Sequence, residues 1–256
     1  MSTAGEPCAV VDPVDYSRAG VAVRADLPAA HRRAWLRLAS PGTWWTGAER
    51  VAIAREVRSE ASCALCTARR DAISPGAVPG EHADAAPLGA TAVEAAHSIA
   101  GDPGRLSKRW LETLEAAGLD GGAYVELVGV VVTVVSIDAF CRAIGVVEHE
   151  LPLPLAGEPS HYRPSQARED GAWVPMIPAL GATGREVDLW RRGATGNVIR
   201  ALSLVPDEVR TLADLSRAHY LPMELVPDPR ARVGTLSRAQ AEFLAARVSA
   251  LRECFY

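Results

Sequence analysis

Hydrophobic residues recur every three or four positions along most of the chain, which is the period of an amphipathic helix. Residues that start or stop helices mark the boundaries, such as the Pro41-Gly42 pair after the first stretch and Thr46 before the second. The pattern predicts helices that begin near residues 28, 46, 62, 92, 106, 120, 206 and 237. We therefore expect an all-α fold.

The stretch between Asp120 and Gly145 has features of two different elements. Its centre, from Gly129 to Val135, has the density of β-branched residues that is typical of a buried strand. The stretch is too long for an ordinary strand, however, and its apolar residues follow a helical period between a capping aspartate and a closing glycine. We interpret it as one long buried helix.

Composition divides the chain into a helical unit over residues 1–147, a segment over 148–188 and a second helical unit over 189–256. The prolines of the middle segment exclude a sustained helix, so we expect an extended linker that lies across the surface. The order helix, loop, long helix and cysteine motif occurs in both helical units. A duplicated unit with an incomplete second copy is therefore expected.

The charge balance restricts the classes of partner. Of 256 residues, 48% are hydrophobic and 23% are charged, and the formal net charge is -4. A compact globular protein without a basic field for nucleic acid or anionic membranes is expected. The most apolar stretch, Leu127 to Ile137, is about half of the roughly 20 residues that span a bilayer. Because Glu6 and Asp12 precede any sustained apolar run, unlike in a secretory signal, we expect a cytoplasmic protein.

Candidate chemistry is concentrated in the Cys-x-x-Cys motif formed by Cys63 and Cys66. The chain has five cysteines, and an odd number argues against a framework of structural disulfides. Ser62 is predicted to cap a helix of which Cys63 is the first residue, where unpaired N–H groups and the helix dipole favour a thiolate. Arg69 and Arg70 would add positive charge on the side of Cys66.

A related pattern stands near the end of the sequence, where Glu242 lies on a predicted helix twelve positions before Cys254. This spacing resembles the alkylhydroperoxidase D-like branch of the carboxymuconolactone decarboxylase superfamily, in which a glutamate precedes Cys-x-x-Cys and a histidine follows it. Residues 119–145 are similar to the next helix of that family. The resemblance implies an alkylhydroperoxidase D-like helical bundle, a thiol-dependent oxidoreductase without a cofactor or metal, and a homo-oligomer.

The sequence departs from the family pattern in both copies. In the first copy the matching acid is Glu49, fourteen residues before Cys63, and Arg70 stands where the family has its histidine. In the second copy the residue that would pair with Cys254 lies beyond Tyr256, and related proteins lead us to expect a selenocysteine codon there. The family's catalytic roles therefore fall on Cys63, Cys66, Arg70 and Glu49, and on Cys254 and Glu242.

The resemblance also implies the order of the reaction. Cys66 attacks a peroxide, forms a sulfenate and is resolved by Cys63 into an intramolecular disulfide, which a thiol electron donor then reduces. Because Arg70 cannot relay a proton, exchange with a disulfide substrate is the alternative reaction.

Two other interpretations of the cysteine pair stay open. Cys63 and Cys66 have the spacing of half a zinc site, which His82 and His97 would complete. His97 is also the one histidine that we keep as a candidate for a substitute proton shuttle. Alternatively, the pair consists of buried small residues in a helical binding or assembly protein, as we expect of Cys141 in its apolar helix.

Several acids have less definite roles. Glu56 and Glu60 are alternatives to the family's glutamate, but together with Arg58 they are interpreted as a solvated helix face. Glu126 is interpreted as a cap-region acid or as a buried carboxylate that faces the cysteines.

Overall fold

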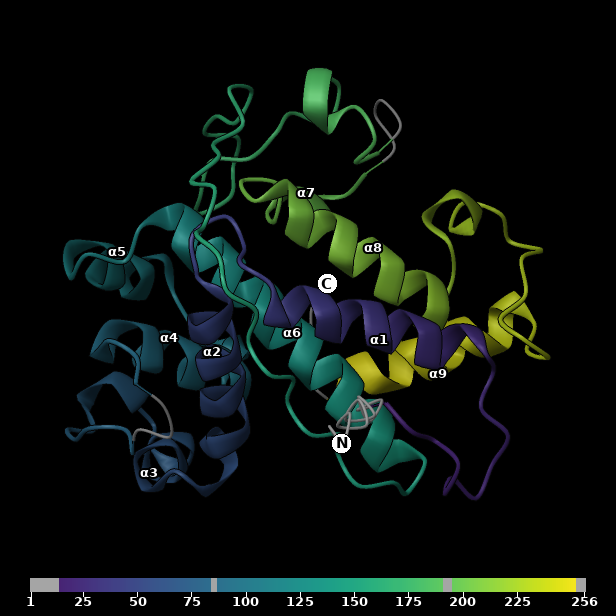
Figure 1. Cartoon of the computed structure of the whole chain (residues 1–256), viewed down its shortest axis with the longest axis horizontal. Coiled ribbons are helices and arrows are strands. Elements are labelled where there is room, and N and C mark those ends of the chain that lie inside the picture. Colours follow the sequence, from purple (N-terminus) through teal and green to yellow (C-terminus); the bar gives the residue numbers. More distant parts are fainter. Residues whose placement is uncertain (1–13, 84–86, 191–194, 252–256) are drawn as a thin grey trace, which may run out of the picture.

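The computed structural model describes residues 14–83, 87–190 and 195–251, and within these ranges it contains helices and no strand. The all-α prediction is confirmed. The α-helices are α1 (Asp26–Ala39), α2 (Gly47–Ser59), α3 (Ala64–Asp71), α4 (Ala90–Gly101), α5 (Lys108–Ala116), α6 (Gly121–Ala143), α7 (Asn197–Arg200), α8 (Pro206–His219) and α9 (Arg238–Leu251) (Figure 1). The short 3-10 helices are η1 (Glu60–Ser62), η2 (Pro75–Ala77), η3 (Pro103–Arg105), η4 (Gly184–Glu186) and η5 (Met223–Leu225).

Helix α6 is the central element of the fold, and α2, α4 and α8 pack against it (Figure 1). Asp120 caps it by accepting a hydrogen bond from the N–H of Gly122. Val130, Val134 and Ile137 are almost completely buried, and each such side chain contributes about 1.5–3 kcal/mol on burial. The β-branched run therefore lies in a helix, as predicted, because surrounding helices enclose it.

By length and composition alone, α6 is apolar enough to cross a membrane. In this protein, 67% of its most apolar window is buried among other parts of the chain. The core helix of a globular protein has the same property, so this finding is weak evidence for a membrane span.

Helix α2 begins at a capping box. The Thr46 side chain accepts a hydrogen bond from the N–H of Glu49, and Glu49 Oε2 accepts from the N–H and the hydroxyl of Thr46 at 2.8 and 2.7 Å. The predicted start of the helix is thus confirmed. The carboxylate of Glu49 is engaged in this cap.

The segment over 148–188 contains no α-helix, in agreement with its prolines. The N–H of Leu155 donates to the carbonyl oxygen of Ala39 at 2.8 Å, which lays this part of the segment along the end of α1. Met176 and Ile177 are fully buried, however. The prediction of a linker across the surface is wrong for that part, because these two side chains are enclosed in the interior.

Helix α8 packs against α1 and α6 (Figure 1). Its Leu215 belongs to the same buried cluster as Leu127 and Val131 of α6. An ion pair of 2.8 Å joins Asp214 of α8 to Arg33 of α1. The predicted third region is therefore packed directly on the first.

A buried ionic cluster joins α2, α6 and α8. Arg50 forms ion pairs with Glu126 and with Glu208, the latter at 3.0 Å, and all three side chains are at most 3% exposed. Glu126 Oε2 also accepts the N–H groups of Thr43 and Trp44 at 2.9 and 2.6 Å. Burial raises the pKa of Glu126, although Arg50 opposes this shift. The interpretation of Glu126 as a carboxylate facing the cysteines is wrong, because it faces Arg50.

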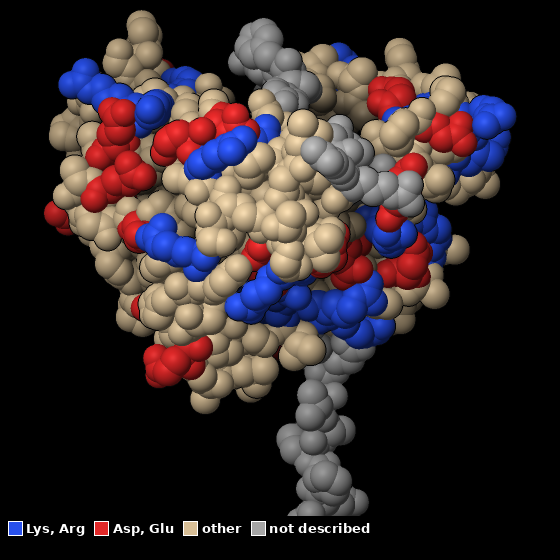
Figure 2. Space-filling view, turned by 90° about the horizontal axis from the view of Figure 1, so that it is seen from above, with Lys and Arg blue, Asp and Glu red and all other residues tan. Residues whose placement is uncertain are grey.

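On the face seen in Figure 2, basic and acidic side chains lie close together over much of the surface. Several arginines of the described residues are paired with acids, including Arg210 with Asp188 at 2.7 Å. Such pairing limits the reach of any single-sign field.

Candidate functional site

The Cys-x-x-Cys motif lies at the start of α3. Cys63 is the N-cap residue, with extended backbone angles, and its carbonyl oxygen accepts the N–H of Thr67 at 3.0 Å. Ser62 belongs to the preceding 3-10 turn, and its hydroxyl donates to the carbonyl oxygen of Ser59. The prediction that Ser62 caps the helix is wrong by one residue, because the 3-10 turn delays the start of α3.

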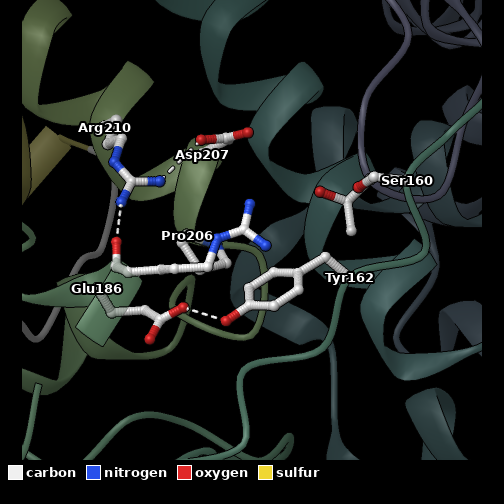
Figure 3. A pocket seen from close by; sticks show the side chains of 8 residues that line it. Ser160, Tyr162, Glu186, Pro206, Asp207 and Arg210 are labelled. Carbon is white, nitrogen blue, oxygen red and sulfur yellow. Dashed lines mark hydrogen bonds and ion pairs between the residues drawn. The ribbon is translucent and has the colours of Figure 1, made fainter. Parts of the chain in front are cut away.

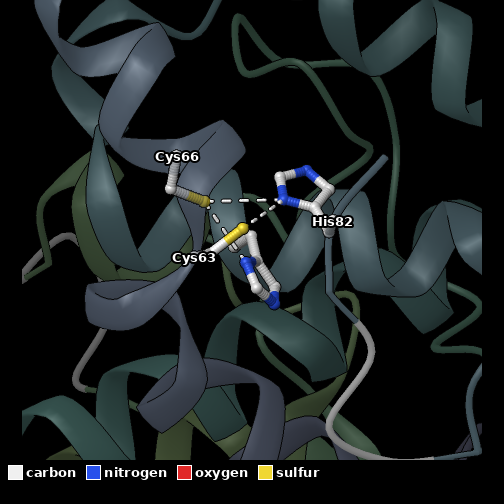
Figure 4. Close-up of side chains that lie close together, drawn as sticks. Cys63, Cys66 and His82 are labelled. Atoms are coloured by element: carbon white, nitrogen blue, oxygen red, sulfur yellow. Dashed lines mark hydrogen bonds between the residues drawn. The ribbon is translucent and has the colours of Figure 1, made fainter. Parts of the chain in front are cut away.

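Two histidines complete a cluster with the cysteines. The candidate ligand atoms of Cys63, Cys66, His82 and His97 all lie within 4.8 Å of one another. His82 Nδ1 is 3.5 Å from each of the two sulfur atoms (Figure 4), and His97 Nδ1 is 3.2 Å from Cys66 Sγ. The four residues come from the start of α3, the loop after η2 and the middle of α4. We call them the Cys/His centre.

Each histidine of the Cys/His centre has a carboxylate behind it. Glu94 Oε2 lies 2.9 Å from His82 Nε2, and Glu56 Oε2 lies 3.0 Å from His97 Nε2. A ring that donates its Nε2–H to a carboxylate presents the lone pair of Nδ1 on its other side. The carboxylates therefore orient both Nδ1 atoms toward the sulfurs.

Glu56 is completely buried, so its interpretation as part of a solvated helix face is wrong. It lies on the side of α2 that packs against α4, where His97 is also completely buried. Glu60 is 8% exposed and forms an ion pair with Arg70 at 2.5 Å. The sequence pattern of α2 and η1 did not indicate the burial of Glu56 and Glu60, because both positions carry charged side chains.

The cysteines are buried in a small cluster of their own. Cys63 is 3% exposed and Cys66 is 8% exposed, and they pack with Leu65 and with the partly buried Val78. This cluster is separate from the main core around α6. The apolar packing that holds α3 in place is therefore small.

The two thiols have different acidities. Burial raises the pKa of Cys63, but the backbone N–H groups of Cys66 and Ala83 and the side chain of His82 outweigh this and lower it to about 6. Burial and the neighbouring Cys63 raise the pKa of Cys66 to about 12. At neutral pH the thiolate is expected on Cys63, whereas the resemblance implies that Cys66 attacks.

The charges around His82 favour its protonated form. Burial lowers the pKa of His82, but its hydrogen bonds with Glu94 and Cys63 outweigh burial and raise it. Burial raises the pKa of Glu94, but hydrogen bonds from His82 and Arg69 outweigh burial and hold it well below its usual range. The centre thus contains a thiolate beside an imidazole that can carry a proton.

The other predicted site residues that the structure describes interact with groups other than these sulfurs. Glu49 is held in the cap of α2, and Arg70 is paired with Glu60. Glu242 is an exposed acid of α9 that accepts hydrogen bonds from Arg238, at 2.5 Å, and from Tyr220. Cys254 lies outside the described residues. Of the predicted residues, the structure brings together Cys63, Cys66, His82 and His97.

A separate polar pocket of about 260 Å³ lies between the middle segment and α8 (Figure 3). In it, the hydroxyl of Tyr162 donates to Glu186 at 2.5 Å, and Arg210 is paired with Asp207 at 2.9 Å. These charged groups are satisfied by one another. The pocket contains no cysteine or histidine among its lining residues.

No family model matches this chain, and no curated protein or solved structure is significantly similar to it.

Proposed function

We propose that Cys63 and Cys66 form a redox-active dithiol that is oxidised to an intramolecular disulfide. Their sulfur atoms lie within 4.8 Å of each other at the open end of a helix. A disulfide requires a distance of about 2.05 Å, so the sulfurs must move toward each other. The small apolar cluster around α3 opposes such a local movement only weakly.

The observation that carries this proposal is the chain of contacts from Glu56 through His97 to Cys66. Cys66 holds its proton at neutral pH and must lose it to close the disulfide. His97 Nδ1, 3.2 Å from the sulfur, can accept that proton, and the carboxylate of Glu56 stabilises the resulting imidazolium. A pair of merely buried cysteines needs no such acceptor.

With a hydroperoxide as the oxidant, the thiolate of Cys63 attacks one peroxide oxygen and breaks the O–O bond. The other oxygen takes a proton and leaves as an alcohol, or as water from hydrogen peroxide. Cys66 then attacks the sulfenic acid of Cys63 and expels its oxygen as water. In sum, two thiols and one hydroperoxide give one disulfide, one alcohol and one water.

We extend the proposal to the alkylhydroperoxidase D-like kind of oxidoreductase, with a duplicated helical fold, a peroxide or disulfide substrate, a thiol electron donor and self-association. The sequence resemblance supports this extension. The acidities of the two thiols favour Cys63 as the attacking residue, which reverses the order that the resemblance implies.

The test is a count of free thiols before and after one equivalent of hydrogen peroxide. The protein is first treated with a chelator, and Cys8 and Cys254 are replaced by serine so that they do not contribute. We expect loss of two thiols. In the Cys66→Ser variant we expect loss of only one, because the sulfenate of Cys63 then has no partner.

Cys141→Ala provides the matched control, because Cys141 is buried in α6 away from the centre. Its loss should leave the two-thiol reaction unchanged. Retention of all thiols in the Cys141→Ala protein after peroxide treatment would refute the redox proposal.

A further inference from the structure

The Cys/His centre contains more than a dithiol needs. Four side chains from three separate segments direct two sulfur atoms and two Nδ1 atoms at one small buried volume. Thiol chemistry accounts for the cysteines and for one proton acceptor. A histidine that activates Cys63 need lie beside that sulfur alone, whereas His82 Nδ1 is equally close to both sulfurs.

The distances match those of a tetrahedral zinc site. Zinc lies about 2.3 Å from a cysteine sulfur and about 2.0–2.1 Å from a histidine nitrogen, so neighbouring sulfur and nitrogen ligands are about 3.6 Å apart. The observed separations between sulfur and nitrogen are 3.5, 3.5 and 3.2 Å. A metal ion could therefore be accepted with shifts of only a few tenths of an ångström in these pairs.

The carboxylates fix the rings in the form that a metal requires. With Nε2 facing Glu94 or Glu56, each neutral ring carries its proton on Nε2 and leaves Nδ1 free to coordinate. A carboxylate behind a coordinating histidine is the usual arrangement in zinc proteins, where it sets the tautomer and strengthens the ligand. Both histidines of the centre have such a partner.

Charge also favours a divalent ion at this position. Two thiolates and one Zn²⁺ have no net charge, which suits a centre where Cys63, Cys66 and His97 are at most 8% exposed. Sulfur and imidazole ligands in a tetrahedral arrangement favour zinc over the harder magnesium and calcium ions.

We propose that Cys63, Cys66, His82 and His97 bind one zinc ion in a closed, four-coordinate site. Because the protein supplies all four ligands, no position is left for a substrate or water, and the role of the ion is structural. The ion would connect α3, the loop that carries His82 and α4. It would supply the stability that the small apolar cluster around α3 lacks.

Zinc and the disulfide compete for the same sulfur atoms. Zinc binds the deprotonated thiols and releases their protons, whereas the disulfide leaves no thiolate to bind. Bound zinc is therefore expected to protect Cys63 and Cys66 from peroxide. The zinc site does not depend on the proposed redox function, because the histidines and their carboxylates carry it.

The experiment adds one equivalent of Co²⁺, and separately Zn²⁺, to the reduced, metal-free full chain. Cobalt in a tetrahedral site with thiolate ligands gives strong visible absorption bands, which zinc should abolish by displacement. Metal content after dialysis is measured by elemental analysis. We expect one zinc per chain, and at least a tenfold loss of zinc affinity in His82→Ala and in His97→Ala.

The matched control is His161→Ala, because His161 is exposed and lies on the Trp44 ring, away from the centre. It should bind zinc as the unaltered chain does. Circular dichroism of each variant shows whether its helices have formed, and His82→Ala changes a residue that lies in a loop and not in a helix.

Two outcomes would overturn the zinc proposal: no stoichiometric zinc on the reduced chain, or unchanged affinity in both histidine variants. The redox proposal is judged separately, by thiol loss in the metal-free protein. If the chain loses two thiols but binds no zinc, only the redox proposal stands. If it binds zinc but keeps its thiols when it is metal-free, only the zinc proposal stands.

Discussion

Two pairs of histidines lie inside this protein, and their surroundings give them opposite properties. In the Cys/His centre, His82 and His97 each face a carboxylate on one side and sulfur on the other. In the second pair, His31 Nε2 lies 2.6 Å from His219 Nε2, and the hydroxyl of Tyr16 bonds to His31 Nδ1. Within the described residues, no carboxylate is hydrogen-bonded to this second pair.

The pKa values follow from these partners. Hydrogen bonds with Glu94 and Cys63 raise the pKa of His82 in spite of its burial. Burial lowers the pKa of His31 to about 3, and the neighbouring His219 adds to this shift. The comparison shows that burial of a histidine does not by itself mark a functional site. The partners decide whether the neutral ring is favoured, as in His31, or the protonated ring, as in His82.

The largest expected difference concerns the two thiols of the centre. In metal-free protein at pH 7, iodoacetamide should modify Cys63 at least about 100-fold faster than Cys66, because only Cys63 is then a thiolate. Peptide mass spectrometry at successive times measures both rates. In denatured protein the two rates should become equal. Equal rates in the folded protein would contradict the expected difference in pKa between the two thiols.

The second prediction concerns the His31 pair in acid. The pKa of His31 is lower in the folded state than in the unfolded state, so the unfolded state binds more protons between pH 6.5 and about 3. Stability from the neutral ring is therefore present above pH 6.5 and is lost as the pH falls, by up to about 1.4 kcal/mol per pH unit.

The measurement compares urea unfolding of the unaltered chain and of His31→Gln at several pH values. As the pH falls, the free energy of unfolding should decrease more in the unaltered chain than in His31→Gln. Parallel pH dependences would show that His31 is not held neutral. Titrating groups that do not interact with His31, such as Asp138, contribute equally to both proteins and cancel in the difference, whereas the contribution of its partner His219 belongs to the measured effect.

The third prediction removes a carboxylate from the Cys/His centre. In Glu94→Gln, His82 loses the charged partner that orients its ring, and we expect zinc affinity to fall about 10- to 100-fold. Competition with a chromophoric chelator measures this affinity. Glu115→Gln on the exposed side of α5 is the control and should have no effect. An unchanged affinity in Glu94→Gln would mean that the carboxylate does not support the ligand.

The smallest expected effect concerns Glu49 and tests whether this residue is a helix cap or a catalytic acid. Glu49→Ala should lower the free energy of unfolding by about 1 kcal/mol, because it removes one half of the capping box of α2. Thr46→Ala removes the other half and should cost a similar amount. Neither change should alter the reactivity of Cys63. A slower reaction with peroxide in Glu49→Ala alone would restore the catalytic role that the family resemblance gives to Glu49.

The sequence by itself determined the longer α-helices and the motif, whereas the four-residue α7 and the 3-10 helices were not predicted. Periodic apolar residues and local caps such as Thr46 and Asp120 set where α2 and α6 begin, because these signals act over one or two turns. Cys63 and Cys66 could be recognised for the same reason, since their spacing is local. His82 and His97 were considered as completing ligands from their residue type and order in the chain.

Only the tertiary structure decided which residues meet at the centre. Glu56 was assigned to a solvated face from its charge, yet packing of α2 on α4 buries it against His97. Glu94 gave no local signal, because its partner His82 lies in a loop twelve residues earlier. A charged side chain can be satisfied by water or by a partner distant in sequence, and only the packing of the helices determines which of these it meets.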